Sequence, residues 1–280
     1  MTNCTFTGNS AAFYGGGMYN SVGTLPTVTN CTFSGNTAGL DGGGMYNIVS
    51  SPTVANCAFS GNSADGDGGG MYNIVSSPTV TNCTFSGNTA NFDGGGMYSS
   101  NEFGGQSNPT VLNCILWGDT PNEIIDVAGA VTTVSYTDVQ GGWPGEGNIN
   151  TDPLFVAPGI GDLRLMPGSP CIDAADNTAV PKGIDTDLDG NPRFVDDPDT
   201  DDTGFGDPPI VDMGAYEFQV MNCPWDVNGD GVVDRHDLVE VVHNLGVCDD
   251  PDNCPWDVNG DGVVNGRDVA AVARHFGACP

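Results

Sequence analysis

The sequence predicts an all-β solenoid followed by a small α-helical module, and two internal repeats carry this prediction. The first repeat reads NCTF, then TGNSA, then GGGMYN, and its units follow at intervals of 27, 26, 26 and 31 residues. These units are rich in Thr, Val, Asn and Gly without helical periodicity, which is typical of short strands separated by turns. The second repeat has a period of 31 residues and joins an acidic loop to an amphipathic segment. Units of the first repeat begin at Asn3, Asn30, Asn56, Asn82 and Asn113.

Stacking of the first repeat determines which side chains we expect inside. One such unit cannot bury a hydrophobic face alone, so successive units must stack. Equivalent residues then form ladders at the strand spacing of about 4.8 Å. The inward ladders are Val28, Val54, Val80 and Val111; Cys31, Cys57 and Cys83; Phe33, Phe59 and Phe85; and Met18, Met45, Met71 and Met97. The amide ladders are Asn30, Asn56, Asn82 and Asn113, placed at bends, and Asn36, Asn62 and Asn88.

The repeated glycines and cysteines add two expectations. Three consecutive glycines in each unit allow a tight turn with positive φ and a close approach between turns. Stacked cysteines lie within disulfide reach, but strand geometry rarely suits the dihedral angle of about 90° that a disulfide needs. The sequence therefore favours a column of buried free thiols over cross-links.

The repeat resembles that of right-handed parallel β-helix proteins. In one unit the motifs are Phe33-Ser34-Gly35-Asn36 and Gly42-Gly43-Gly44-Met45, and equivalents recur along the chain. This pairing of motifs is similar to the passenger repeats of polymorphic outer-membrane proteins, and the resemblance covers residues 2–118. We assign residues 1–170 to the β-helix, with irregular final turns. Met1 lies within a unit, so we expect the β-helix to be truncated at its N-terminus.

Residues 171–220 form a separate acidic segment, with thirteen acidic residues against Lys182 and Arg193. The stretches GSPCIDAAD, DLDGNPR and VDMGAYEF are similar to the C-terminal segment of β-helix proteins called choice-of-anchor Q domains. We expect a cap that seals the open end of the β-helix, whose last turn otherwise presents unpaired N–H and C=O groups.

Part of the acidic segment also has the spacing of a cation-binding loop. Asp185, Asp187, Asp189 and Asp196 fall at positions 1, 3, 5 and 12 of such a loop, with Gly190 at position 6. Arg193 at the ninth position opposes a cation. The sequence favours a solvated acidic loop here, and a further calcium ion at Asp185, Asp187 and Asp189 is the alternative.

Two copies of an oxygen-rich loop stand in register within residues 221–280. Each begins CPWDVNGDGVV and is followed by an amphipathic segment that predicts a helix. Oxygen ligands at positions 1, 3, 5, 7, 9 and 12, with glycine at position 6, surround calcium in loops of this kind. The spacing therefore predicts two calcium ions. The first loop offers Asp226, Asn228, Asp230, Val232 (carbonyl), Asp234 and Asp237; the second offers Asp257, Asn259, Asp261, Val263 (carbonyl), Asn265 and Asp268.

A loop followed by a helix, duplicated, resembles the dockerin domain; a calmodulin-type hand has a preceding helix and Glu at position 12. The resemblance implies a cohesin-like protein partner, read by positions 10 and 11 of the loops. These positions are Arg235, His236, Gly266 and Arg267, without the hydroxyl pair often found there. We expect the helices to bury Leu238, Val241, Val242, Leu245, Val269, Val272 and Phe276, and we expect no metal role for His243 and His275.

Four cysteines frame the two copies, and two symmetric disulfide pairings are open. One pairing lies within each copy, Cys223–Cys248 and Cys254–Cys279, and the other between copies, Cys223–Cys279 and Cys248–Cys254. Each copy contains a helix of about ten residues, roughly 15 Å long, whereas a disulfide needs Cα atoms within about 7 Å. Helices packed antiparallel, as the dockerin resemblance implies, favour the pairing between copies.

Composition limits the partners and the location. The formal net charge is −30, from 36 acidic residues against 6 Lys and Arg, which repels nucleic acid and anionic membranes and attracts divalent cations. No apolar run is long enough for a transmembrane helix, and residues 1–20 contain no signal peptide. Ten cysteines and the dockerin resemblance favour an extracellular or cell-surface protein.

Enzyme and non-enzyme functions both remain open. Residues 1–163 contain no Lys, Arg or His, which argues against a lyase that uses a basic side chain. Asp41, Asp67 and Asp93 are expected to stack one turn apart, close to the separation of about 5 Å found in retaining glycosidases. Turn residues are the simpler interpretation of these aspartates. The favoured function is structural, adhesive or glycan-binding, with a glycoside hydrolase or a component of a polysaccharide-degrading complex as the alternative.

Overall fold

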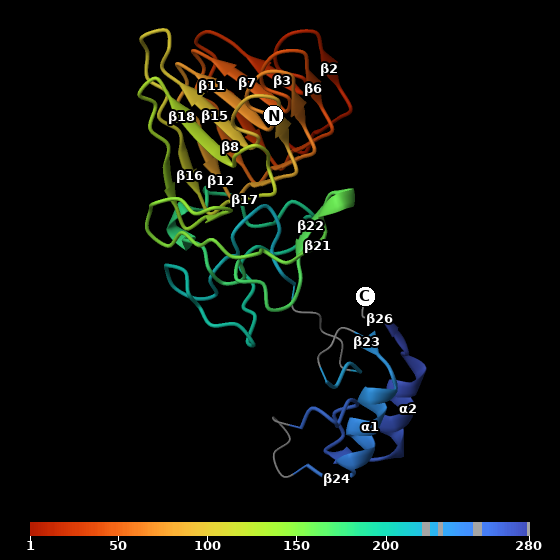
Figure 1. Ribbon diagram of the computed structural model, residues 1–280. Helices are drawn as coiled ribbons and strands as arrows, with labels where there is room; N and C mark the ends of the chain where they lie inside the picture. The colour runs from red at the N-terminus through yellow and green to blue at the C-terminus, as the bar shows by residue number, and fades with distance from the viewer. Residues whose placement is uncertain (220–224, 229–231, 249–253, 279–280) are drawn as a thin grey trace. The chain divides into compact units, whose positions relative to one another are not determined.

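The computed structural model describes residues 1–219, 225–228, 232–248 and 254–278 of the chain (Figure 1). It divides into two compact units, Met1–Gln219 and Val220–Pro280, which we call the N-terminal unit and the C-terminal unit. The N-terminal unit is a stack of parallel strands, and the C-terminal unit contains the two α-helices of the described residues.

Four parallel sheets build most of the N-terminal unit, because each of the first four repeats contributes one short strand to each sheet. The first sheet contains β1 (Thr5–Thr7), β5 (Thr32–Ser34), β9 (Ala58–Ser60), β13 (Thr84–Ser86), β17 (Ile115–Trp117) and β20 (Asp138–Val139). The second contains β2 (Ser10–Ala11), β6 (Thr37–Ala38), β10 (Ser63–Ala64) and β14 (Thr89–Ala90). The third contains β3 (Met18–Asn20), β7 (Met45–Ile48), β11 (Met71–Ile74), β15 (Met97–Ser100) and β18 (Ile124–Val127). The fourth contains β4 (Thr27–Thr29), β8 (Thr53–Ala55), β12 (Thr79–Thr81), β16 (Thr110–Leu112) and β19 (Thr133–Ser135).

The predicted inward ladders are confirmed. Phe33 pairs with Phe59 and Phe59 with Phe85, and their rings stack with centroids 4.6 and 4.5 Å apart. The Val and Cys ladders are fully buried, and so are the Met ladder residues except Met18, which is partly exposed. Among the described cysteines, those of the repeats are free thiols. Equivalent residues occupy equivalent places because the repeat spacing fixes the strand register.

Amide ladders also run along the stack. Asn36 donates from its backbone and side chain to the Asn62 side chain at 3.0 and 2.8 Å, and Asn62 repeats both bonds to Asn88. The asparagines at the bends have positive φ, but their predicted ladder is incomplete because the Asn82 amide has no hydrogen-bond partner. Two further ladders were not predicted: Asn20, Asn47 and Asn73 inside, and Tyr46, Tyr72 and Tyr98 on the outer face.

The triple glycines work as predicted. Gly42 has φ +72° and turns the chain. A Cβ on the next residue, Gly43, would lie 2.5 Å from the carbonyl oxygen of Gly69 in the following turn. The turns therefore approach too closely at this point for any side chain.

A pair of acids ends the Asn36 ladder. Asp119 occupies the next position and accepts from the Asn88 backbone and side chain at 2.6 and 2.8 Å. Its amide donates to Glu123 Oε1 at 3.1 Å, while Asp119 Oδ2 and Glu123 Oε2 are buried without a hydrogen-bond partner. Burial first, and then the Asp119 charge, raise the pKa of Glu123 well above 4.5.

Glu123→Gln is expected to stabilise the N-terminal unit at pH 8 by about 1–3 kcal/mol, because on folding Glu123 must either bury its charge or take up a proton that the unfolded chain does not hold at this pH. Because the pKa of Glu123 is raised in the folded state, the free energy of unfolding of the wild type falls as the pH rises. The gain should therefore shrink towards pH 5. Urea unfolding at both pH values measures it, with the exposed Glu102→Gln as control. Equal stability of Glu123→Gln and wild type at pH 8 would contradict the prediction.

The C-terminal end of the stack is closed by the segment around Trp143, which packs against the interior ladders. The amide of Tyr136 donates to the Glu146 carbonyl at 2.8 Å, and that of Ile149 donates to the Thr137 carbonyl at 3.1 Å. The expectation that residues 171–220 seal this end is therefore corrected. A loop within the final turns performs that role.

The acidic segment instead lies along the side of the stack (Figure 1). It packs against the outer surface of the first sheet, where Ala58 and Ile115 are buried in a shared apolar cluster. The neighbouring elements are β21 (Phe155–Ala157), β22 (Asp162–Leu165) and the 3-10 turns Pro158–Ile160 and Asn177–Ala179. Arg193 donates to the Asn56 side chain at 2.6 Å, Ala215 donates to the Thr84 hydroxyl at 2.9 Å, and the Asn113 side chain donates to the Asp176 carbonyl at 2.8 Å. These contacts span three turns.

Candidate metal centre

Two loop–helix copies exchange short strands in the C-terminal unit. The helices are α1 (Arg235–His243) and α2 (Gly266–Arg274), which pack together. β23 (Val232–Val233) pairs with β26 (Gly277–Ala278), and β24 (Gly246–Val247) pairs with β25 (Val263–Val264), both antiparallel. The strand before each helix therefore pairs with the strand after the other helix.

One of the two disulfides predicted between the copies is present. The structure contains the Cys248–Cys254 disulfide, with Cα atoms 6.0 Å apart, which confirms that half of the pairing between copies. Cys223 and Cys279 lie outside the described residues. Trp225 stacks on His275 with ring centroids 3.4 Å apart, so the start of the first loop meets the end of α2.

The second loop turns its first carboxylate inward. Asp257 accepts from the amides of Asp261 and Gly262 at 3.1 and 2.6 Å. Gly262 has φ +85°, the sharp bend expected at position 6. Asn265, at position 9, caps α2 by accepting from the Arg267 amide at 2.9 Å. The loop and the helix start thus share one hydrogen-bonded framework.

The last carboxylate of each loop is fully buried. Asp268 accepts from the amides of Asn259 and Asn265 at 3.3 and 2.8 Å. Asp237 likewise accepts from the amides of Val227 and Asp234 at 2.8 and 2.7 Å. Burial acts to raise the pKa of Asp237, but the amide hydrogen bonds outweigh it and lower the pKa. Asp237 is therefore held as an anion at the N-terminus of α1, and Asp268 occupies the equivalent position in α2.

The donor set suits calcium. Every predicted ligand offers oxygen, and Cys248 and Cys254 are joined in a disulfide, so they offer no thiolate. Asp226 and Asp257, the first ligands of the two loops, line one open cavity of about 550 Å³. Asp230 lies outside the described residues; the other predicted ligands are placed in the two loops, at the strand β23 or β25, or at the helix starts.

Helix burial follows the prediction only in part. Val241 and Val272 are fully buried, and Leu238 and Val269 pack partly against them. Val242, Leu245 and Phe276 are 42%, 54% and 52% exposed, which corrects the prediction for these three. The helices end at His243 and Arg274, so Leu245 and Phe276 lie beyond the amphipathic period. Val242 lies on the outer face of α1.

The predicted third loop has a different local arrangement. Asp187 is buried, and its two oxygens accept from the amides of Asn191 and Glu217 at 2.8 and 3.2 Å. Within the described residues, the three-carboxylate group that could hold a metal ion is instead Asp173, Asp196 and Asp202. Asp196 alone belongs to the predicted loop. Asp173 and Asp202 are 29 positions apart, and no spacing motif signals them.

The stacked aspartates of the repeats bond to the backbone. Asp41 accepts from the Asp67 amide at 3.0 Å, and Asp67 accepts from the Asp93 amide at 2.9 Å. Burial raises the pKa of Asp41 and Asp67. Each carboxylate thus links one turn to the next, which is the arrangement expected of turn residues.

The comparisons with known proteins agree with this architecture. Residues 1–138 match the family described as the right handed beta helix region, and residues 224–277 match the dockerin type I domain. Searches of curated proteins and of solved structures give no significant match. The chain therefore combines a parallel β-solenoid of the right-handed β-helix type with a C-terminal dockerin type I domain.

Dockerin type I domains bind calcium and attach to cohesin domains. The α-helices of the described residues have nine residues each and are too short and too polar to cross a membrane.

Proposed function

We propose that this chain is an extracellular or cell-surface β-helix protein that docks, through a dockerin carrying two calcium ions, onto a cohesin-like domain. The observation that carries this proposal is the duplicated, strand-exchanged loop–helix unit with oxygen donors in both loops. The Cys248–Cys254 disulfide supports an oxidising compartment.

The first ion is assigned to the loop from Asp226 to Asp237 and the second to the loop from Asp257 to Asp268. Bound calcium supplies the positive charge that lets several carboxylates converge in each loop. The protein holds both ends of the second ligand set in place, because Asp257 and Asp268 already accept backbone amides, and it holds Asp237 at the end of the first set in the same way. Calcium should therefore favour the folded C-terminal unit.

The partner surface is assigned to the starts of both helices. Arg235 and His236 begin α1, Gly266 and Arg267 begin α2, and all four are exposed. Two of the six Lys and Arg residues of the chain, Arg235 and Arg267, lie at these helix starts, so an otherwise acidic protein presents basic side chains here. An acidic partner surface would complement these groups.

We assign the β-helix a structural, adhesive or glycan-binding role. Its stacked aspartates bond to the backbone of neighbouring turns, and residues 1–163 contain no basic side chain. In a polysaccharide-degrading complex, the role of the β-helix would then be to bind or present the polysaccharide and not to cleave it.

Capture on a panel of immobilised cohesin domains tests the attachment. The full chain should bind at least one of them in calcium and dissociate in EDTA. Arg235→Ala with Arg267→Ala should weaken binding at least tenfold, about 1.4 kcal/mol, because both side chains are exposed at the proposed surface. Arg274→Ala, at the far end of α2, is the control and should bind like wild type. Binding that survives EDTA, or none to any cohesin, counts against the proposal.

A further inference from the structure

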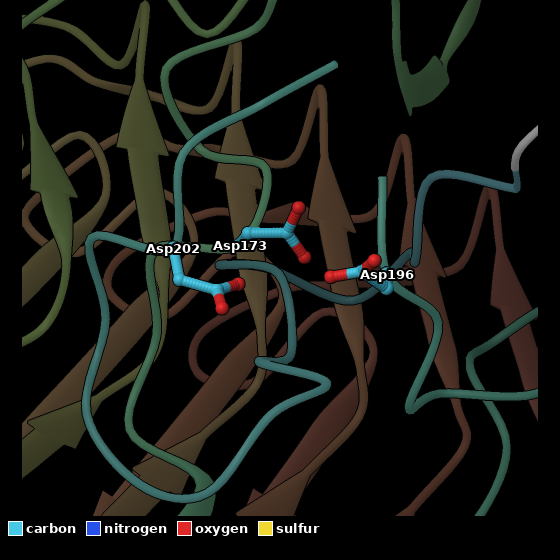
Figure 2. A group of neighbouring side chains, drawn as sticks. All are labelled: Asp173, Asp196 and Asp202. Atoms are coloured by element: carbon cyan, nitrogen blue, oxygen red, sulfur yellow. The ribbon is translucent and has the colours of Figure 1, made fainter. Parts of the chain in front are cut away.

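Three carboxylates from distant positions converge in the acidic segment of the N-terminal unit. Asp173, Asp196 and Asp202 each place a carboxylate oxygen within 4.8 Å of the other two. Figure 2 shows the carboxylates of Asp173 and Asp196 turned toward each other, with that of Asp202 beside them. Asp173 is fully buried, whereas Asp196 and Asp202 are exposed.

Asp173 carries a buried oxygen with no partner. Its Oδ2 accepts from the Asp197 amide at 3.2 Å, but its Oδ1 has no hydrogen-bond partner. The neighbouring buried Asp212 differs, because its two oxygens accept from the amides of Asp173 and Phe218 at 2.8 and 2.5 Å. An unpaired buried carboxylate oxygen is costly unless a cation or donor meets it.

The backbone holds Asp173 and the loop around it in place. The Asp173 carbonyl accepts from the amides of Thr203 and Gly204 at 2.9 and 3.1 Å. Asp202 precedes these donors directly in sequence and is thereby brought to Asp173. Asp197, beside Asp196, is tied to Asp173 by its amide. The three ligands are therefore positioned by main-chain contacts before any ion arrives.

Basic side chains among the described residues do not neutralise this group. Arg193, the buried arginine of the segment, is committed to Asn56, Gly214, Ala215 and Glu217. Within the described residues, none of the ion pairs includes Asp173, Asp196 or Asp202. A hard divalent cation matches three converging carboxylates, and two exposed ligands leave room for the waters that complete its coordination.

We propose that Asp173, Asp196 and Asp202 bind one divalent cation of the calcium class, independently of the dockerin loops. The ion joins the exposed 196–202 loop to Asp173, which lies between Ile172 and Ala174 of the buried cluster against the first sheet. Calcium would then order this loop on the side of the β-helix.

Counting calcium in the full chain tests the site. Asp196→Asn with Asp202→Asn removes two exposed ligands, so folding should be retained. The matched control is Asp199→Asn with Asp201→Asn, which removes the same charge from exposed positions of the same loop. Equilibrium dialysis against calcium should show one ion fewer per chain for the ligand variant and the wild-type count for the control. Equal counts in all three proteins, or the same loss in both variants, would overturn the proposal.

Hydrogen exchange gives a local second measurement. Calcium should slow exchange of the amides of Thr203 and Gly204 at least tenfold in wild type and in the control, and leave the Asp196→Asn, Asp202→Asn protein unchanged. These two amides belong to the N-terminal unit, whereas the dockerin loops belong to the C-terminal unit. Calcium-independent exchange at both positions in wild type would also overturn the site.

Discussion

Asp226→Ala with Asp257→Ala is expected to abolish calcium binding by both loops of the C-terminal unit. Each change removes the first ligand of its loop, and Asp257 also anchors the amides of Asp261 and Gly262. The buried apolar core of this unit is small, so metal binding and folding should be coupled. Titration calorimetry on the full chain should lose both dockerin ions, and capture by cohesin domains should fall at least a hundredfold, about 2.7 kcal/mol.

The control and the remaining ion make this result specific. Asp65→Ala with Asp207→Ala removes the same charge from exposed positions of the N-terminal unit and should leave both loops unaffected. The site at Asp173 predicts that the loop variant still binds one ion. A loop variant with an undiminished ion count contradicts the ligand assignment, and its result does not depend on whether the Asp173 site exists.

Sequence reasoning predicted the repeat region well because its physics is local. Once the period is known, a parallel in-register stack places Phe33 on Phe59 and Val54 on Val80 without further information. The outer Tyr46 ladder was not predicted, because ladders were expected only for inward side chains and for the asparagines. Its rings are only 5% to 7% exposed, since each tyrosine covers the next.

The non-repeating features were not predicted because no period or local spacing connects the residues that form them. No spacing links Asp173 to Asp202, and no period shows that the acidic segment meets Ala58 and Ile115 on the side of the stack. The burial of Leu245 and Phe276 was overestimated because apolar identity alone does not show where a short helix ends. The dockerin loops were found because their ligands follow a fixed local spacing.

Arg193 is the clearest case of a residue whose role only the tertiary structure reveals. Its sequence position suggested an obstacle to a cation, yet its side chain is fully buried and joins the acidic segment to the β-helix through Asn56. It also donates to the Ala215 carbonyl at 2.8 Å and lies 3.6 Å from Glu217 Oε2. Burial first, and then the Asp212 charge, raise the pKa of Glu217, and Arg193 opposes that rise.

Arg193→Met is therefore expected to destabilise the N-terminal unit by about 3–5 kcal/mol, because it leaves buried acids without their cation. The loss should be larger at pH 8 than at pH 5, since Glu217 can take up a proton more readily at the lower pH. Urea unfolding followed by near-UV circular dichroism measures both. Arg164→Met is the matched control: Arg164 pairs with Asp162 at 2.6 Å, but its side chain is 57% exposed, so the same substitution should cost about 0–1 kcal/mol. Equal effects of the two substitutions would show that Arg193 does not hold the acidic segment against the β-helix.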